Sequence, residues 1–175
     1  MPPIKEERLF EQAEALLDRH QQGPGRPRDT NLRRAVSTAY YALFHGLTSS
    51  VSEWLAPLQP NNARQSLRRA LGHNGMKQVC VSVTRPDTGS KFEYVKLLAA
   101  KAAVSQDVVD IAQAFIDLQQ ARHSADYDHA APFSKSMALA LVDEVGDAVA
   151  LLQPAAGTSE FEAFAILLVL QGGGR

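Results

Sequence analysis

Apolar side chains recur at intervals of three or four residues along most of this 175-residue chain. This is the spacing of one face of an α-helix, and it constrains the fold more than any other feature of the sequence. The longest uninterrupted stripe comprises Leu32, Val36, Ala39, Leu43, Leu47 and Val51. Shorter stripes lie within residues 5–21, 61–71, 94–102, 104–118 and 134–152. The pattern predicts an all-α protein, an up-and-down bundle of five to six helices.

The boundaries of these helices are marked by residues that favour helix ends. Caps are expected from Asp29, Thr30 or Asn31, from Asn61 or Asn62, and from Ser105. The segment 23–30 contains two glycines and two prolines, so a loop is expected there. Pro57 and Pro60 end the long second helix.

One segment departs from the helical pattern. Val79, Val81 and Val83 alternate with polar or small residues, as in a short strand, and residues 85–89 read as a turn. The sequence therefore predicts a small hairpin or an ordered loop near residues 79–90.

Composition favours one domain inside the cell. The hydrophobic content of 45% suffices for one continuous core, which we assign to residues 1–153, and residues 154–175 form a tail that can dock on the domain or on a dimer partner. A single cysteine, Cys80, excludes a disulfide framework. Charged residues interrupt the first ten positions, and the most apolar run, 161–170, is about half of the roughly 20 residues that span a bilayer. We expect a cytoplasmic protein without a membrane span.

The charges are distributed unevenly, although the net charge is only −1. Residues 1–101 hold 15 of the 18 Lys and Arg residues and 9 of the 19 Asp and Glu residues. This asymmetry can create a basic face for a polyanion, or it can let the two halves attract each other within one fold. A phosphate-tracking nucleic-acid surface would be built from Arg33, Arg34, Arg64, Arg68 and Arg69, with Arg26 and Arg28; a solvated charged face is the alternative.

Arg122 occupies a position where the helical pattern predicts an apolar residue. The stripe 104, 108, 111, 115, 118 places position 122 on the inward face. A buried guanidinium needs a carboxylate, carbonyl oxygens or a ligand, because an unpaired buried charge costs several kcal/mol. An ion pair with Asp126, one helical turn later, would meet this need without any function. If the helix continued, His129 would share the face of Arg122 and Asp126.

Two motifs give the chain a resemblance to a known family. Residues 32–45 read Leu-Arg-Arg-Ala-Val-Ser-Thr-Ala-Tyr-Tyr-Ala-Leu-Phe-His, and residues 122–129 read Arg-His-Ser-Ala-Asp-Tyr-Asp-His. Together they resemble the HEPN (higher eukaryote and prokaryote nucleotide-binding) family in order and in separation. The resemblance covers residues 5–153.

The resemblance implies an all-α bundle that forms a homodimer, binds RNA and, in many members, cleaves RNA without a metal or another cofactor. Such proteins act as toxins beside a nucleotidyltransferase-type antitoxin, or in defence. By this resemblance Arg122 is the motif arginine, His123 its polar neighbour and His129 the motif histidine. A guanidinium can hold a phosphate bidentately, and an imidazole can transfer a proton near neutral pH. The alternative is a non-catalytic module of the same kind that binds RNA, a nucleotide or a protein.

Further residues near the two motifs could bind a substrate, and each has a plainer interpretation. Tyr40 and Tyr41 could stack on a base, His45 could line the same pocket, and Asp126 and Tyr127 are assigned to substrate binding with them. Tyrosines and a histidine on a core helix are also common packing residues. A metal site at His123, Asp126 and His129 is disfavoured, because spacings of three and six residues rotate around a helix.

Overall fold

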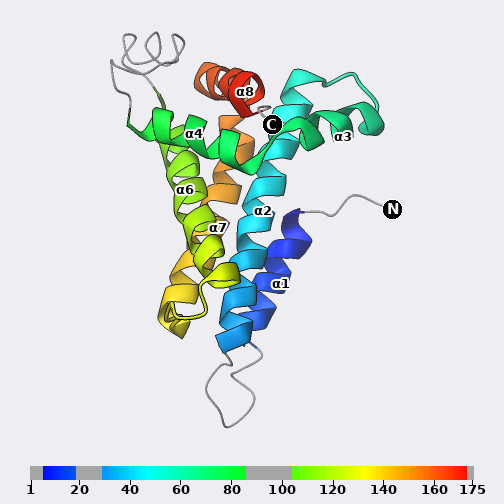
Figure 1. The fold of residues 1–175 in the computed structure, drawn as a ribbon. Helices are drawn as coiled ribbons and strands as arrows, with labels where there is room; N and C mark the ends of the chain where they lie inside the picture. The colour runs from blue at the N-terminus through cyan, green and yellow to red at the C-terminus, as the bar shows by residue number, and fades with distance from the viewer. Residues whose placement is uncertain (1–5, 19–28, 86–103, 173–175) are drawn as a thin grey trace.

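The computed structural model describes residues 6–18, 29–85 and 104–172, and every regular element within these ranges is a helix (Figure 1). The all-α prediction is confirmed. The helices are α1 (Glu6–Asp18), α2 (Asp29–Leu55), α3 (Asn61–Ala70), α4 (His73–Thr84), α6 (Gln106–Tyr127), α7 (Lys135–Ala155) and α8 (Ser159–Gly172). The helix expected at 94–102 lies outside the described residues.

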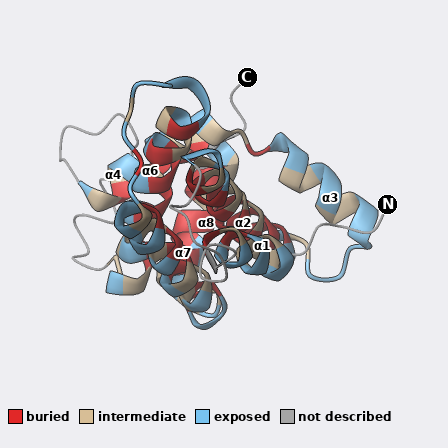
Figure 2. Cartoon of the chain, turned by 90° about the horizontal axis from the view of Figure 1, so that it is seen from below, coloured by how far each residue is buried: buried red, intermediate tan, exposed pale blue. Residues whose placement is uncertain are grey.

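The long helix α2 forms the centre of the bundle. It packs against α1, α6 and α7, while α4 lies across one end of the bundle and packs against α6 and α8 (Figure 1). The inward stripe of α2 is buried as the sequence predicts, and Val36, Ala39, Leu43 and Leu47 are fully inaccessible to solvent. In contrast, α3 buries none of its residues and projects from the body of the domain (Figure 2).

The helix caps follow the sequence in part. The hydroxyl of Ser105 accepts a hydrogen bond from the Val108 amide, as expected, and Ser134 caps α7 through the Met137 amide. The prediction of a cap at Asn61 or Asn62 is wrong, because Pro60 precedes the first turn of α3 and provides no side-chain cap. Proline fits that position because its fixed φ is compatible with entry into a helix.

The prediction of a hairpin near 79–90 is wrong where the structure describes this segment. Residues 79–84 belong to α4, and residues 86–90 lie outside the described part. Met76, Val79, Cys80 and Val83 are all buried, and they follow a three-four spacing that the alternating valines concealed. Packing of this face against α6 and α8 outweighs the β-propensity of valine, which is a weak and context-dependent preference.

The segment assigned to a tail contains a helix that belongs to the core. Phe161, Phe164, Leu167 and Leu168 of α8 are at most 2% exposed, and they join the same buried cluster as α2 and α4. Helix α7 continues past Leu152 and includes Pro154. Among the described residues, no helix is both long enough and apolar enough to cross a bilayer.

Candidate functional site

Arg122 lies where the sequence pattern placed it, at the end of the buried face of α6. Val108, Ile111, Phe115 and Leu118 on this face are completely buried. The Arg122 side chain, one turn later, keeps 21% of its surface exposed. The guanidinium therefore sits at the border between the core and the solvent, where a ligand can reach it.

The guanidinium is held by one carboxylate and one phenol. Arg122 Nε lies 2.7 Å from Asp126 Oδ2, which confirms the ion pair expected at i+4. Arg122 Nη2 donates to the hydroxyl of Tyr41 over 3.2 Å. Burial disfavours the charged form, but the neighbouring Tyr41 and the Asp126 carboxylate outweigh it and raise the pKa of Arg122. The charge is therefore permanent.

Aromatic rings surround the same guanidinium. Its central carbon lies 5.9 Å from the ring centre of Tyr40, 5.5 Å from that of Tyr41 and 5.8 Å from that of Tyr127. At these distances a cation is attracted by the electron-rich ring faces. Tyr40 is fully buried, whereas Tyr127 is 64% exposed. Tyr40 is thus a packing residue, and Tyr41 and Tyr127 are accessible to a ligand.

Two histidines extend the cluster along α2 and onto α4. The ring of His45 stacks on Tyr41 with a centre-to-centre distance of 6.3 Å. His73, the first residue of α4, stacks on Phe44 at 4.0 Å and lies edge-on to Tyr41 at 6.1 Å. Its Nδ1 forms a 2.5 Å hydrogen bond with the Tyr40 hydroxyl.

His73 is the residue of this site that the sequence analysis missed. It is separated from Tyr40 by 33 positions and from Arg122 by 49, and no periodic pattern links it to either. The only available clue was its position after Gly72, where a helix could start. The packing of α4 against α6, together with the bond from Gln119 Nε2 to the His73 carbonyl over 3.1 Å, brings it to the site.

Both histidines are uncharged at neutral pH. Burial lowers the pKa of His73 below 6.5, the positive charge of Arg122 lowers it further, and His45 adds to the decrease at the acidic pH where it becomes protonated. Burial also lowers the pKa of His45; Glu6 acts in the opposite direction and Arg68 adds to the decrease. The site therefore combines one permanent cation with two neutral imidazoles.

These two shifts predict a pH dependence of stability. The free energy of unfolding should decrease as the pH falls below about 6.5, because the unfolded chain then binds protons at His45 and His73 more readily than the folded protein does. Urea unfolding at pH 7.5 and at pH 5.5 measures the decrease. In the double variant His45→Gln, His73→Gln the decrease should be smaller, and an identical decrease in both proteins would show that other groups cause it.

The other two candidate histidines lie away from the aromatic cluster. His123 is exposed and packs on Tyr127, with ring centres 5.1 Å apart. The condition under which His129 would share the face of Arg122 is not met, because α6 ends at Tyr127 and His129 follows in an exposed turn. The Asp128 carboxylate stabilises this turn by accepting hydrogen bonds from the amides of Ala130 and Ala131.

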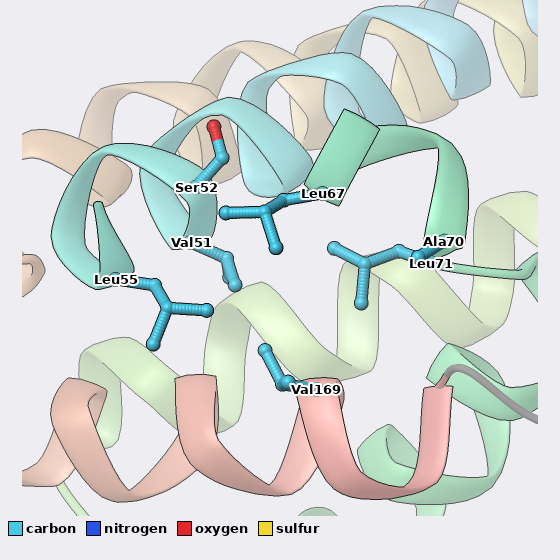
Figure 3. A pocket seen from close by; sticks show the side chains of 7 residues that line it. All are labelled: Val51, Ser52, Leu55, Leu67, Ala70, Leu71 and Val169. Atoms are coloured by element: carbon cyan, nitrogen blue, oxygen red, sulfur yellow. The ribbon is translucent and has the colours of Figure 1, made fainter. Parts of the chain in front are cut away.

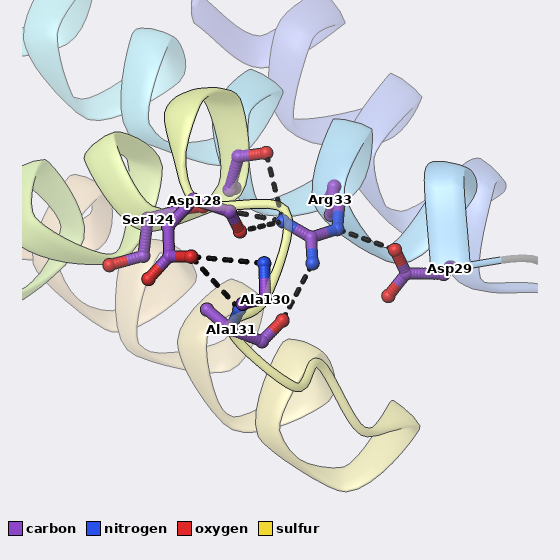
Figure 4. A network of polar contacts seen from close by, with 7 residues as sticks. Asp29, Arg33, Ser124, Asp128, Ala130 and Ala131 are labelled. Atoms are coloured by element: carbon purple, nitrogen blue, oxygen red, sulfur yellow. Dashed lines mark hydrogen bonds and ion pairs between the residues drawn. The ribbon is translucent and has the colours of Figure 1, made fainter.

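Arg33 has a structural role that excludes it from a nucleic-acid surface (Figure 4). Its Nη1 donates to the carbonyl oxygens of Ser124, Ala125 and Asp128, and its Nη2 donates to that of Ala131 over 2.6 Å. Its Nε forms an ion pair with Asp29, and its side chain is only 12% exposed. The guanidinium that was expected to contact a phosphate instead binds carbonyl oxygens of the last turn of α6 and of the loop that follows it.

The remaining candidate arginines are spread over two elements. Arg34 is exposed on α2, and Arg64, Arg68 and Arg69 lie on the projecting helix α3. Arg68 donates to the Ser52 hydroxyl over 3.0 Å, and Arg64 donates to the Asn61 side chain. Arg69 is exposed. Arg68 also forms an ion pair with Glu53 at 3.4 Å, so within the basic strip of α3, Arg64, Arg68 and Arg69, it is Arg69 that is most accessible to a polyanion.

A small cavity of about 40 Å³ lies between α2, α3 and α8 (Figure 3). It is lined by Val51, Ser52, Leu55, Leu67, Ala70, Leu71 and Val169. The hydroxyl of Ser52, its one polar side-chain group, is already bonded to Arg68 and to the Ser49 carbonyl. The cavity lacks free polar groups and is unsuited to an anionic ligand.

Comparison of the chain with family models, with curated proteins and with solved structures found no match in any of the three. The residues of the site are therefore identified from the distances and contacts within this chain. Within the described ranges, no three His, Cys, Asp or Glu side chains are grouped as they would be around a metal ion. The residues that do converge are Arg122, Tyr41, Tyr127, His45 and His73.

Proposed function

We propose that the protein is a HEPN-like endoribonuclease that cleaves RNA without a metal ion, as an RNA-processing toxin of a toxin-antitoxin or defence system. One observation carries the proposal. The two motifs behind the resemblance, 81 residues apart at Tyr41 and Arg122, meet through the 3.2 Å hydrogen bond between these side chains. A permanent cation beside accessible aromatic rings suits an RNA phosphate and its bases, and His129 is the proposed acid or base for proton transfer.

In this proposal the roles follow from the position of each group. Arg122 binds the scissile phosphate, Tyr41 and Tyr127 contact neighbouring bases, and Asp126 orients the guanidinium. The basic strip Arg64, Arg68 and Arg69 attracts the flanking RNA backbone. His129, in the exposed turn after α6, would have to reach the phosphate by movement of the turn or from a second subunit.

The proposal includes partners that the resemblance implies. RNA is the substrate, a second copy of the chain forms a homodimer, and a nucleotidyltransferase-type protein serves as the antitoxin. A two-fold axis near the end of α6 would bring two copies of the motif 122–129 together, as a symmetric interface requires.

Cleavage in the presence of a chelator tests the proposal. Purified protein with EDTA should cut single-stranded RNA and leave 2′,3′-cyclic phosphate ends, because attack by the 2′-hydroxyl needs only proton transfer and charge stabilisation. End-group analysis by mass spectrometry identifies the products. A matched DNA oligonucleotide, which lacks the 2′-hydroxyl, serves as the control and should remain intact. RNA that is bound but uncut across several sequences would instead indicate a non-catalytic binding module.

A further inference from the structure

The direction of the hydrogen bond between Tyr40 and His73 decides which nitrogen of the His73 ring carries the proton. Tyr40 is fully buried, and burial raises the pKa of its phenol well above the ordinary value of 10.0, so the hydroxyl keeps its hydrogen. A buried hydroxyl needs an acceptor for that hydrogen, and His73 Nδ1 lies 2.5 Å away. If Nδ1 accepts, the neutral ring carries its own hydrogen on Nε2.

The imidazole is also held in one orientation. Phe44 packs on one ring face at 4.0 Å, Tyr41 meets the ring edge-on at 6.1 Å, and Gln119 fixes the backbone of His73 through its carbonyl. Nδ1 points to the buried Tyr40, so Nε2 lies on the other side of the ring, and the residue as a whole is partly exposed. The Nε2 hydrogen is thus available to a ligand.

Tyr41 links this donor to Arg122. Its hydroxyl accepts a hydrogen bond from Arg122 Nη2, which leaves its own hydrogen free to donate. The ring of Tyr41 adjoins both the guanidinium and the imidazole, with centre distances of 5.5 Å and 6.1 Å. Tyr41 therefore supplies one hydrogen-bond donor itself and adjoins two others, the Arg122 guanidinium and the His73 ring.

We propose that His73 Nε2–H and the Tyr41 hydroxyl complete, with Arg122, a binding site for a phosphate group, and that Tyr40 sets the tautomer of His73 that this site requires. The positive charge of Arg122 provides the attraction to the anion. The two neutral donors define the position of its oxygens, because each donates one directed hydrogen bond. Nothing in this arrangement lets His73 Nε2 accept a proton from a 2′-hydroxyl, so His73 is a binding residue and Tyr40 a positioning residue.

The assignment of the phosphate to RNA rests on the proposed function, but the site itself can be tested without cleavage. Two substitutions separate the nitrogens of His73. In His73→Gln the side-chain amide nitrogen replaces Nε2, so the donor toward the ligand is kept. In His73→Asn the amide lies near the position of Nδ1, so the contact with Tyr40 can be kept while the donor toward the ligand is lost.

The probes are inorganic phosphate and a 2′-O-methyl RNA oligonucleotide, which cannot form a cyclic phosphate. The oligonucleotide should bind His73→Gln within about threefold of its affinity for the wild-type protein and should bind His73→Asn about tenfold more weakly, the loss expected for one hydrogen bond to an anion. Circular dichroism establishes that both variants are folded, and competition by inorganic phosphate reports on the same site.

Nitrogen-15 NMR of the histidine side chains gives a second measurement. The wild-type spectrum should place the His73 hydrogen on Nε2, and phosphate should shift that resonance; in Tyr40→Phe both tautomers should be populated. A hydrogen on Nδ1, wild-type affinity of His73→Asn, or no binding of either probe by the wild-type protein would overturn the phosphate site. If His73→Asn cleaves RNA and binds the oligonucleotide as tightly as the wild-type protein does, the phosphate site is overturned and the ribonuclease proposal stays intact. Binding of both probes by a protein that cleaves no RNA would overturn the ribonuclease proposal and leave the phosphate site intact.

Discussion

Replacing Arg122 with lysine is expected to reduce RNA cleavage by about a hundredfold to a thousandfold, although the charge is kept. A guanidinium can donate to Tyr41, form an ion pair with Asp126 and still present hydrogens to two phosphate oxygens. An ammonium group is a point charge that cannot keep this planar arrangement. The size of the effect is that of removing one directed donor from a site that stabilises developing charge. Single-turnover cleavage of a labelled RNA measures it.

Arg8→Lys is the matched control, because Arg8 is exposed on α1 and has no role in the proposed RNA-binding site. Its cleavage rate should stay within about twofold of the wild-type rate. Equal rates for Arg122→Lys and the wild-type protein, with both proteins folded, would contradict a role of Arg122 at the phosphate. Tyr41 would then be its structural partner only.

Replacing Arg33 with methionine is expected to lower the free energy of unfolding by about 2 kcal/mol, the scale for removing a charged donor from partly buried acceptors. The substitution removes the hydrogen bonds to four carbonyl oxygens at the end of α6 and the ion pair with Asp29. It also removes the contact between the guanidinium and the ring of Phe133, 4.9 Å apart. Methionine keeps the apolar stem but supplies no donor.

Urea unfolding of Arg33→Met and of Arg34→Met makes the comparison. Arg34 is the next residue on α2 and is exposed, so its substitution should change the free energy of unfolding by less than about 0.5 kcal/mol. Arg33→Lys should recover little of the loss, because one ammonium cannot reach oxygens spread over the last turn of α6 and the following loop. Similar stabilities of the Arg33→Met and Arg34→Met proteins would mean that solvent satisfies those carbonyls equally well.

The sequence determined the helices other than α4 and α8, and it determined the placement of Arg122. The stripes on α2 and α6 repeat every three or four residues over several turns, and local backbone geometry converts such a repeat directly into one buried face. Position 122 could be assigned to that face because it continues the same helix. The ion pair with Asp126 was predictable for the same reason, since it spans a single turn.

Tertiary structure alone decided the rest of the site. Residues 79–84 became helical because α6 and α8 cover one face of α4, and a pattern of six residues is too short to reveal that face. His73 contacts Tyr40 because α4 lies across the bundle. Arg33 does not join the expected nucleic-acid surface, because its guanidinium binds carbonyl groups 91 to 98 residues later in the chain. Periodicity records which face of a helix is buried. Only the packing of helices determines which side chains from distant parts of the chain share a hydrogen bond, because that depends on distances that no local pattern contains.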